Sequence, residues 1–252
     1  NRGEPWHDDD SGGFGDSYGD YETKIIAGNT FNYPSIHGEA ALKAGISYVS
    51  CGSDAVEDSI VDMKIYKSVD LILGKQRQTK MGNGGYYPIS FKTFTPRMQS
   101  AIKNYTENGG NIFVSGSFIA SDLWCNPIIE STAEDCEFAQ NVLHYKWRNS
   151  RAARTGKVNG VASTIGTFNG NYTYNNTLND SCYVVESPDG IEPADNDAGT
   201  IMRYTENNLS AAVAWQGKYR TVALGFPFET INNTEARNNL MKQILNFFKM
   251  IK

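Results

Sequence analysis

The sequence of 252 residues lacks several features that define whole classes of protein. No apolar run approaches the ~20 residues that cross a bilayer, so we expect no membrane span. The four cysteines include no C-x-x-C pair and only three histidines occur, which argues against a Cys/His zinc site. Cys125 and Cys136 could pair in an oxidising compartment, or all four thiols could be reduced. A net charge of −5 disfavours a general nucleic-acid binder.

Charge is unevenly distributed along the chain. Residues 1–22 contain seven acidic side chains and one Arg, a net charge of −6, so the remaining residues sum to +1. Asp8, Asp10 and Asp16 lie in this glycine-rich leader and could supply oxygen ligands to Ca²⁺, although their spacing does not match an EF-hand loop. A linker without a metal is the alternative, and we expect no other cofactor. We predict an acidic leader (1–22) followed by one domain (23–252).

The first half of the chain alternates between short apolar segments and helical patterns. Helices are predicted from Ser35 to Gly45, and from an N-cap at Thr95 with Pro96 in the first turn to a stop at 108–110. Strands are predicted at Lys24–Gly28, Ile46–Cys51, Val69–Leu73 and Asn111–Ser115. This order is typical of a parallel sheet with helices on both faces.

The second half begins with a predicted helix at Glu137–Trp147 and then changes to polar–apolar alternation with frequent turns. The strands predicted there are Lys157–Ser163, Tyr172–Tyr174, Cys182–Glu186, Thr200–Tyr204 and Leu209–Trp215. A strand at Tyr219–Gly225 and an amphipathic helix at Thr234–Met250 close the chain. We therefore predict an α/β fold with a mostly parallel sheet and an antiparallel, β-rich insertion at about 157–215.

Two segments resemble the trehalose-utilisation protein family: Tyr105–Asp122 (YTENGGNIFVSGSFIASD) and Gly217–Phe226 (GKYRTVALGF). The resemblance implies a class I glutamine amidotransferase-like fold, a flavodoxin-like three-layer sandwich. More closely, nearly the whole chain resembles a domain of secreted Bacteroidetes proteins labelled xanthan lyase, through Gly13–Tyr21, Ala27–Gly38, Leu73–Gln76 and Tyr145–Trp147. This resemblance implies a secreted, periplasmic or cell-surface protein, neighbouring modules in a longer chain, and a polysaccharide or cell-wall glycan as partner.

The chain departs from the amidotransferase pattern at the catalytic positions. Amidotransferases of this class use a Cys on a sharp turn after a strand, with a His and a Glu after the last strand. Here the turn reads Ser115-Gly116-Ser117, and Pro227 stands at the His position although Glu229 is kept. Without a thiolate and its imidazole base, we predict no glutaminase activity.

In an open parallel sheet, ligands bind beyond the carboxyl ends of the strands. The loops expected there contain amides, aromatic rings and charges that suit a polysaccharide. The ligand-binding candidates are Asn29, Asn32, Tyr33, Lys75, Gln76, Arg77, Asp122 and Trp124. The alternative is that these side chains only satisfy loop backbone and helix ends.

The sequence leaves open whether the protein is an enzyme. A serine hydrolase would use Ser117 as nucleophile, His37 as base and an acid such as Glu229 behind it, although no G-x-S-x-G elbow is present. A polysaccharide lyase would need a base and cations near the uronate carboxylate, for which the chain offers Tyr33, Lys75, Arg77 and Lys80. A non-catalytic structural module is the third alternative. We expect a glycan-associated module that binds or helps to process polysaccharide.

Overall fold

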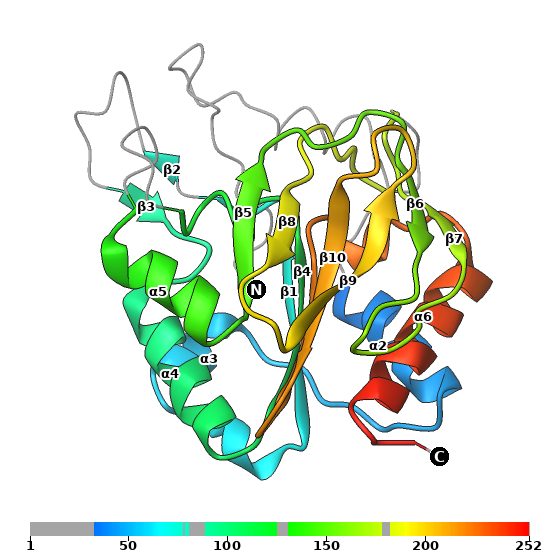
Figure 1. Ribbon diagram of the computed structural model, residues 1–252. Coiled ribbons are helices and arrows are strands. Elements are labelled where there is room, and N and C mark those ends of the chain that lie inside the picture. Colours follow the sequence, from blue (N-terminus) through cyan, green and yellow to red (C-terminus); the bar gives the residue numbers. More distant parts are fainter. Residues whose placement is uncertain (1–32, 78, 81–88, 125–130, 178–181, 252) are drawn as a thin grey trace.

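The central feature of the fold is a twisted, seven-stranded sheet with the strand order β1-β4-β11-β10-β9-β6-β7 (Figure 1). The computed structural model describes residues 33–77, 79–80, 89–124, 131–177 and 182–251. The strands of this sheet are β1 (Ser68–Gly74), β4 (Asn111–Gly116), β6 (Lys157–Gly160), β7 (Asn171–Thr173), β9 (Ala198–Tyr204), β10 (Ser210–Gln216) and β11 (Arg220–Leu224). The structure therefore confirms the strands predicted at Val69–Leu73, Asn111–Ser115 and Tyr219–Gly225.

The sheet is mixed, and most of its strand pairs are antiparallel. β1 pairs with β4 and β4 pairs with β11 in parallel, whereas each remaining pair between β11 and β7 is antiparallel. The predicted mostly parallel sheet is therefore wrong. The reason is that β9, β10 and β11 follow one another through the short connections 205–209 and 217–219, and connections of this length join antiparallel neighbours. The antiparallel strands predicted in 157–215 continue the parallel part as one sheet.

Helices cover both faces of the sheet (Figure 1). α4 (Pro96–Glu107) and α5 (Ala133–Asn141) lie on one face, and α2 (Tyr33–Lys43) and α6 (Thr234–Phe247) lie on the other. Because successive side chains of a strand point to opposite faces, β4 contributes to both cores. Ile112 and Val114 pack with Ile102 of α4, whereas Phe113 packs with Leu240 of α6. The shorter helical elements are α3 (Ser53–Glu57), η1 (Met63–Ile65) and η3 (Phe228–Thr230).

Local capping explains where two of the predicted helices begin. The Thr95 hydroxyl accepts a hydrogen bond from the Met98 N–H at the start of α4, as the sequence predicts. α6 begins after Asn233, whose side chain accepts from the Ala236 N–H. α2 starts at Tyr33, so the predicted cap at Ser35 is wrong.

The helix predicted at Glu137–Trp147 is wrong in its second half. α5 begins with a capping box between Thr132 and Asp135 and ends at Asn141. His144 then has a φ of 62°, which an α-helix does not allow. Tyr145–Asn149 forms β5, which pairs with β8 (Gly190–Pro193) in a two-stranded sheet.

Three further predicted strands have different outcomes. Ile46–Cys51 forms no strand and joins no sheet in the described chain. Cys182–Glu186 is likewise not a strand. Lys24–Gly28 lies outside the described residues. A second short sheet joins β2 (Thr79–Lys80) to β3 (Ile89–Phe91).

Two sequence expectations concern the environment of the protein. Cys136 is disulfide-bonded, so the alternative of four reduced thiols is wrong. Cys125, with which the sequence suggests that it could pair, lies outside the described residues. Cys182 is buried and Cys51 is exposed. In the part of the chain that the structure describes, no helix is long and apolar enough to span a bilayer.

Candidate functional site

The carboxyl ends of β1, β4 and β11 bring most of the predicted site residues to one edge of the sheet. Residues 75–77 follow β1, residues 117–124 follow β4, and residues 225–230 follow β11. α2 begins at this edge and carries Tyr33 and His37. Five candidates lie outside the described residues: Asn29, Asn32, Asp8, Asp10 and Asp16.

His37 is buried between two carboxylates. Its Nδ1 lies 2.8 Å from Asp70 Oδ2 on β1, and its Nε2 lies 3.3 Å from Glu229 Oε2 in η3. The Tyr183 hydroxyl donates to the other Glu229 oxygen at 2.8 Å. The Phe228 ring stands 4.6 Å from the imidazole between centroids. The network therefore joins α2, β1, η3 and the segment that contains Tyr183.

The two carboxylates keep His37 protonated near neutral pH. Burial by itself would lower the pKa of the imidazole, but Asp70 and then Glu229 more than offset this and raise the pKa to about 9. The protonated ring donates from both nitrogens, one to each carboxylate. Asp70 was not among the residues singled out from the sequence. Asp70 could have been identified because it is the one charged residue in the apolar strand Val69-Asp-Leu-Ile-Leu73, and an acid in such a strand needs a partner.

The structure joins His37 to Glu229 but not to Ser117. The Ser117 side chain is buried, and its Oγ has no hydrogen-bond partner among the described residues. Both nitrogens of His37 are bonded to carboxylates instead. Asp122 accepts a hydrogen bond from the Thr93 backbone N–H at 2.8 Å, which ties the turn after β4 to the chain before α4.

Asp189 is a further buried carboxylate at this edge. Its Oδ2 accepts from the backbone N–H groups of Ala120 and Ser121, at 2.9 and 2.7 Å, and from the Ser121 hydroxyl at 3.0 Å. Its Oδ1 is buried without a hydrogen-bond partner in the described chain. Burial raises the pKa of Asp189 to about 7 despite these three donors. No local sequence pattern marks Asp189 as a buried acid, because Pro188-Asp189-Gly190 is typical of an ordinary turn.

Two tryptophans form an aromatic pair beside the turn after β4. Trp124 ends this turn and Trp147 lies on β5; their rings are 6.5 Å apart between centroids and inclined by 45°. Both side chains are half-buried. The Tyr145 hydroxyl donates to the Ile119 carbonyl at 2.6 Å and so holds β5 against the turn. Trp147 was missed as a ligand candidate because the sequence placed it at the end of a helix.

The cationic candidates have partners within the protein. Lys75 Nζ lies 3.2 Å from Glu186 and 5.6 Å from the centre of the Tyr183 ring. The Arg77 guanidinium lies 5.5 Å from the centre of the Phe118 ring. The Gln76 side chain donates to the Lys92 carbonyl. Tyr33 is buried and packs edge-on against Tyr183 at 5.3 Å. The Lys80 side chain lies outside the described part of the chain.

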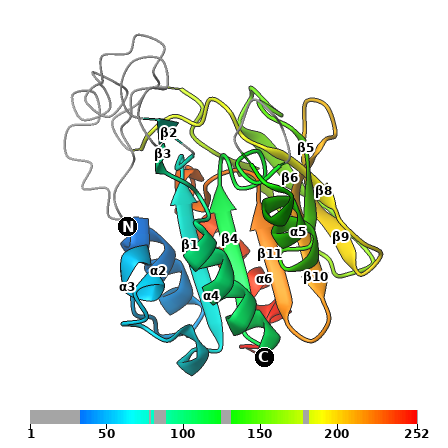
Figure 2. The ribbon, with the colours of Figure 1, turned by 90° about the vertical axis from the view of Figure 1, so that its left-hand side faces the viewer.

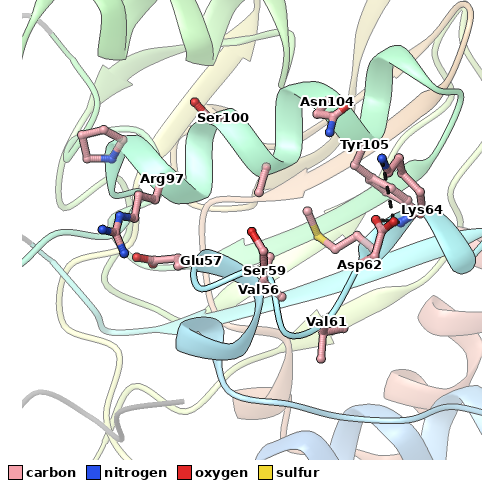
Figure 3. A pocket seen from close by; sticks show the side chains of 13 residues that line it. Val56, Glu57, Ser59, Val61, Asp62, Lys64, Arg97, Ser100, Asn104 and Tyr105 are labelled. Carbon is pink, nitrogen blue, oxygen red and sulfur yellow. Dashed lines mark hydrogen bonds and ion pairs between the residues drawn. The ribbon is translucent and has the colours of Figure 1, made fainter.

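One cavity lies away from this edge. It has a volume of about 700 Å³ and separates α3 and η1 from α4 (Figure 3). Two of the lining cations have acidic partners: Lys64 pairs with Asp62, which also lines the cavity, at 3.8 Å, and Arg97 pairs with Asp58 at 3.1 Å. A second cavity, of about 470 Å³, lies between β7 and the start of α6. Neither cavity contains a predicted site residue. Within the described chain, no group of three or more His, Cys, Asp or Glu residues could hold a metal ion.

Comparison of the sequence with protein-family models and with curated proteins finds no match. Among solved structures, the fold is similar to that of the cytoplasmic protein STM3548 from Salmonella typhimurium, with a TM-score of 0.50 and 15% identity over 85% of this chain and 86% of that chain. At this identity the similarity concerns the fold alone.

Two glycosidases also align with the chain. The β-galactosidase from the psychrophilic Marinomonas ef1 aligns over 91% of this chain with 12% identity and a TM-score of 0.49. The exo-β-1,4-mannosidase Op5Man5 from Opitutaceae bacterium strain TAV5 aligns over 74% with 10% identity and a TM-score of 0.40. The chain spans 26% of the length of each glycosidase.

The His37 network predicts a loss of stability at alkaline pH. Because the folded-state pKa of about 9 lies above the ordinary value of 6.5, this stabilisation is complete below pH 6.5 and is lost as the pH rises through 9. From pH 7 to 9 we expect the wild-type free energy of unfolding to fall by about 2 kcal/mol more than that of His37→Gln. Urea denaturation at both pH values measures this, with His7→Gln as control. Equal pH slopes in wild type and His37→Gln would contradict the assigned network.

Removal of the Asp189 charge is expected to stabilise the fold, whereas removal of the His37 charge is expected to destabilise it. Its folded-state pKa of about 7 exceeds the ordinary value of 3.8, so ionisation destabilises the fold as the pH rises from 4 to 7. Asp189→Asn keeps an oxygen for the Ala120 and Ser121 donors but cannot ionise. We expect this variant to be more stable than wild type at pH 8 by about 4 kcal/mol, and similar to it at pH 4. Denaturation at the two pH values tests this, with the exposed Asp197→Asn as control. A variant less stable than wild type at pH 8 refutes the assignment.

Proposed function

We propose that the protein is a glycan-binding module that holds polysaccharide at the carboxyl edge of β1, β4 and β11, against Trp124 and Trp147. The observation that carries the proposal is the pairing of these two half-buried rings, from segments 23 residues apart in sequence, beside the turn after β4. Sugar rings present apolar faces that stack on aromatic side chains, while their hydroxyl groups need polar partners at the rim. Two inclined rings suit consecutive sugar units better than a single small ligand.

The rings are held by fixed elements, which favours binding. Trp147 lies on β5, and β5 is held by its ladder to β8 and by the hydrogen bond from Tyr145 to Ile119. Trp124 ends a turn whose backbone N–H groups are bound by Asp189. A platform that is ordered before the ligand arrives loses less conformational entropy on binding.

Binding is better supported than hydrolysis. A general base must have an unprotonated nitrogen or oxygen within reach of the proton it removes. His37 donates from both nitrogens to carboxylates, and the Ser117 hydroxyl is buried. The lyase alternative is supported no better, because Tyr33 is buried and Lys75 is paired with Glu186. We therefore place the function in binding rather than in bond cleavage.

The same proposal includes the fold relationship, the location and the modular context of the chain. Helices on both faces of the sheet and the parallel set β1-β4-β11 support a relationship to the flavodoxin-like, amidotransferase-like folds. The disulfide at Cys136 supports a secreted, periplasmic or cell-surface location, because disulfides persist in oxidising compartments. We place the chain as one module, positions 23–252 forming a single domain, in a longer glycan-associated protein related to those labelled xanthan lyase.

Polysaccharide titration tests the binding site. Affinity electrophoresis in gels containing xanthan or a neutral glucan measures the Kd of wild type and of the variants Trp147→Ala and Trp124→Ala. We expect each variant to bind at least ten-fold more weakly, since each loses one stacking face. Trp215→Phe is the matched control, because Trp215 stacks on His144 at the opposite edge of the sheet. Absence of binding by wild type, or unchanged binding by both Trp variants, would refute the proposal.

A further inference from the structure

A cavity of about 470 Å³ lies between β7 and the start of α6, which are neighbours in Figure 1. This volume is within the ~300–1,000 Å³ typical of sites for small molecules. Every lining residue except Ala236 is exposed, so a ligand can reach the cavity from solvent. The lining residues are Asn171 and Thr173 of β7, Asn232 and Asn233 before α6, and Glu235, Ala236 and Asn239 of α6. The cavity is therefore lined mainly by side-chain amides.

Hydrogen bonds on either side of the cavity hold β7 and α6 in place. On one side, the Asn232 N–H donates to the Thr173 carbonyl at 2.9 Å. On the other side, the Gln243 side chain of α6 accepts from the Asn169 N–H at 2.7 Å and donates to the Asn169 carbonyl at 2.9 Å. Asn171 falls between these two attachments along the chain. The walls are therefore fixed by the fold before a ligand arrives, which reduces the conformational entropy lost on binding.

The amide side chains favour a ligand that is rich in hydroxyl groups. An asparagine side chain donates through its NH₂ group and accepts through its oxygen, and the hydroxyl groups of a sugar can also do both. In the described chain, the lining residues include no cation, and Glu235 is the one charged side chain among them. A phosphate, sulfate or uronate group would therefore be repelled rather than bound. The chemistry of the lining indicates a neutral saccharide.

We propose that this cavity binds a short neutral saccharide. Asn171 from β7 and Asn239 from α6 donate to and accept from its hydroxyl groups, and Glu235 accepts from a further hydroxyl while it repels acidic sugars. The site goes beyond the proposed polysaccharide site and shares no residue with the Trp124–Trp147 pair. Trp147 packs against the core that contains the α4 residues, whereas α6 lies on the opposite face of the sheet from α4 (Figure 2).

Titration of the full chain with methyl glycosides tests the site. Amide NMR spectra are recorded with the methyl glycosides of glucose, galactose and mannose, each paired with the corresponding methyl uronide, which differs only in the carboxylate at C6. At least one neutral glycoside should cause saturable shifts in 171–173 and 232–239, and its uronide should bind about five-fold more weakly because of Glu235. The absence of saturable shifts with all three neutral glycosides at about 50 mM overturns the proposal. A uronide that binds as tightly as its neutral glycoside overturns it too.

Two alanine variants locate the binding. Asn171→Ala and Asn239→Ala each remove hydrogen-bonding groups, so each should weaken binding of the neutral glycoside about five-fold. Asn239 occupies an exposed helix position, where alanine favours the helix, so this variant retains the fold. Asn246→Ala, at an exposed position of α6 outside the cavity, is the matched control and should bind like wild type. Unchanged binding in both Asn171→Ala and Asn239→Ala refutes the site.

Two further variants separate the effect of charge from that of the aromatic pair. Glu235→Gln keeps an acceptor without the charge, so the glycoside and its uronide should bind this variant equally. Discrimination against the uronide as strong as in wild type would contradict the role given to Glu235. Trp124→Ala should bind the neutral glycoside as wild type does. Loss of the shifts in that variant would place the binding at the aromatic pair and overturn this inference, whereas unchanged shifts together with weakened polysaccharide binding support two separate sites.

Discussion

The buried imidazolium of His37 is the interaction on which the geometry of the carboxyl edge depends. It joins three elements that are distant in sequence, because α2 supplies the cation, and β1 and η3 supply Asp70 and Glu229. Removing either carboxylate would leave a buried charge without full compensation, which is strongly destabilising. Asp70 keeps 28% of its side chain exposed, whereas Glu229 has none exposed. Glu229 therefore needs both His37 and Tyr183, and the segment containing Tyr183 is fixed over the ends of the strands as a result.

Much of the fold could be predicted from periodicity and capping residues. α4 was predictable because Thr95 and Pro96 are strong starting signals and Asn108–Gly110 is a strong stop. β4 and β11 were predictable from continuous apolar runs. The extension of the helix to Trp147 failed because Tyr145-Lys-Trp-Arg-Asn149 can be interpreted with either period, and the decisive feature, the positive φ of His144, has no sequence signal. The prediction of a mostly parallel main sheet failed because the antiparallel strands of 157–215, which the sequence does predict, pair with β11 through β10 and so continue the main sheet.

Some residues of the candidate site could likewise be predicted from the sequence, and others could not. The strand-end rule placed Glu229 and His37 at one edge, since it depends only on strand order and direction. It could not find Trp147, which reaches the edge through β5, a strand outside the main sheet. It also could not find Asp189, whose role depends on the turn after β4 presenting two N–H groups to one carboxylate. Contacts between segments about 70 residues apart leave no trace in local patterns.

The polar groups of this edge are mostly satisfied by one another, which constrains what the edge can do. A catalytic carboxylate or imidazole is held in position yet keeps one atom available to the substrate. Both nitrogens of His37 are bonded to carboxylates, and Glu229 accepts hydrogen bonds from Tyr183 and His37. One oxygen of Asp189 accepts from three donors, and the other oxygen is buried. Such groups stabilise the junction of α2, β1 and the turn after β4 without offering a reactive atom. The proposed glycan binding therefore depends on side chains that keep exposed surface, and Trp124 and Trp147 are the paired aromatic residues beside the turn after β4 that are half-buried in the described chain.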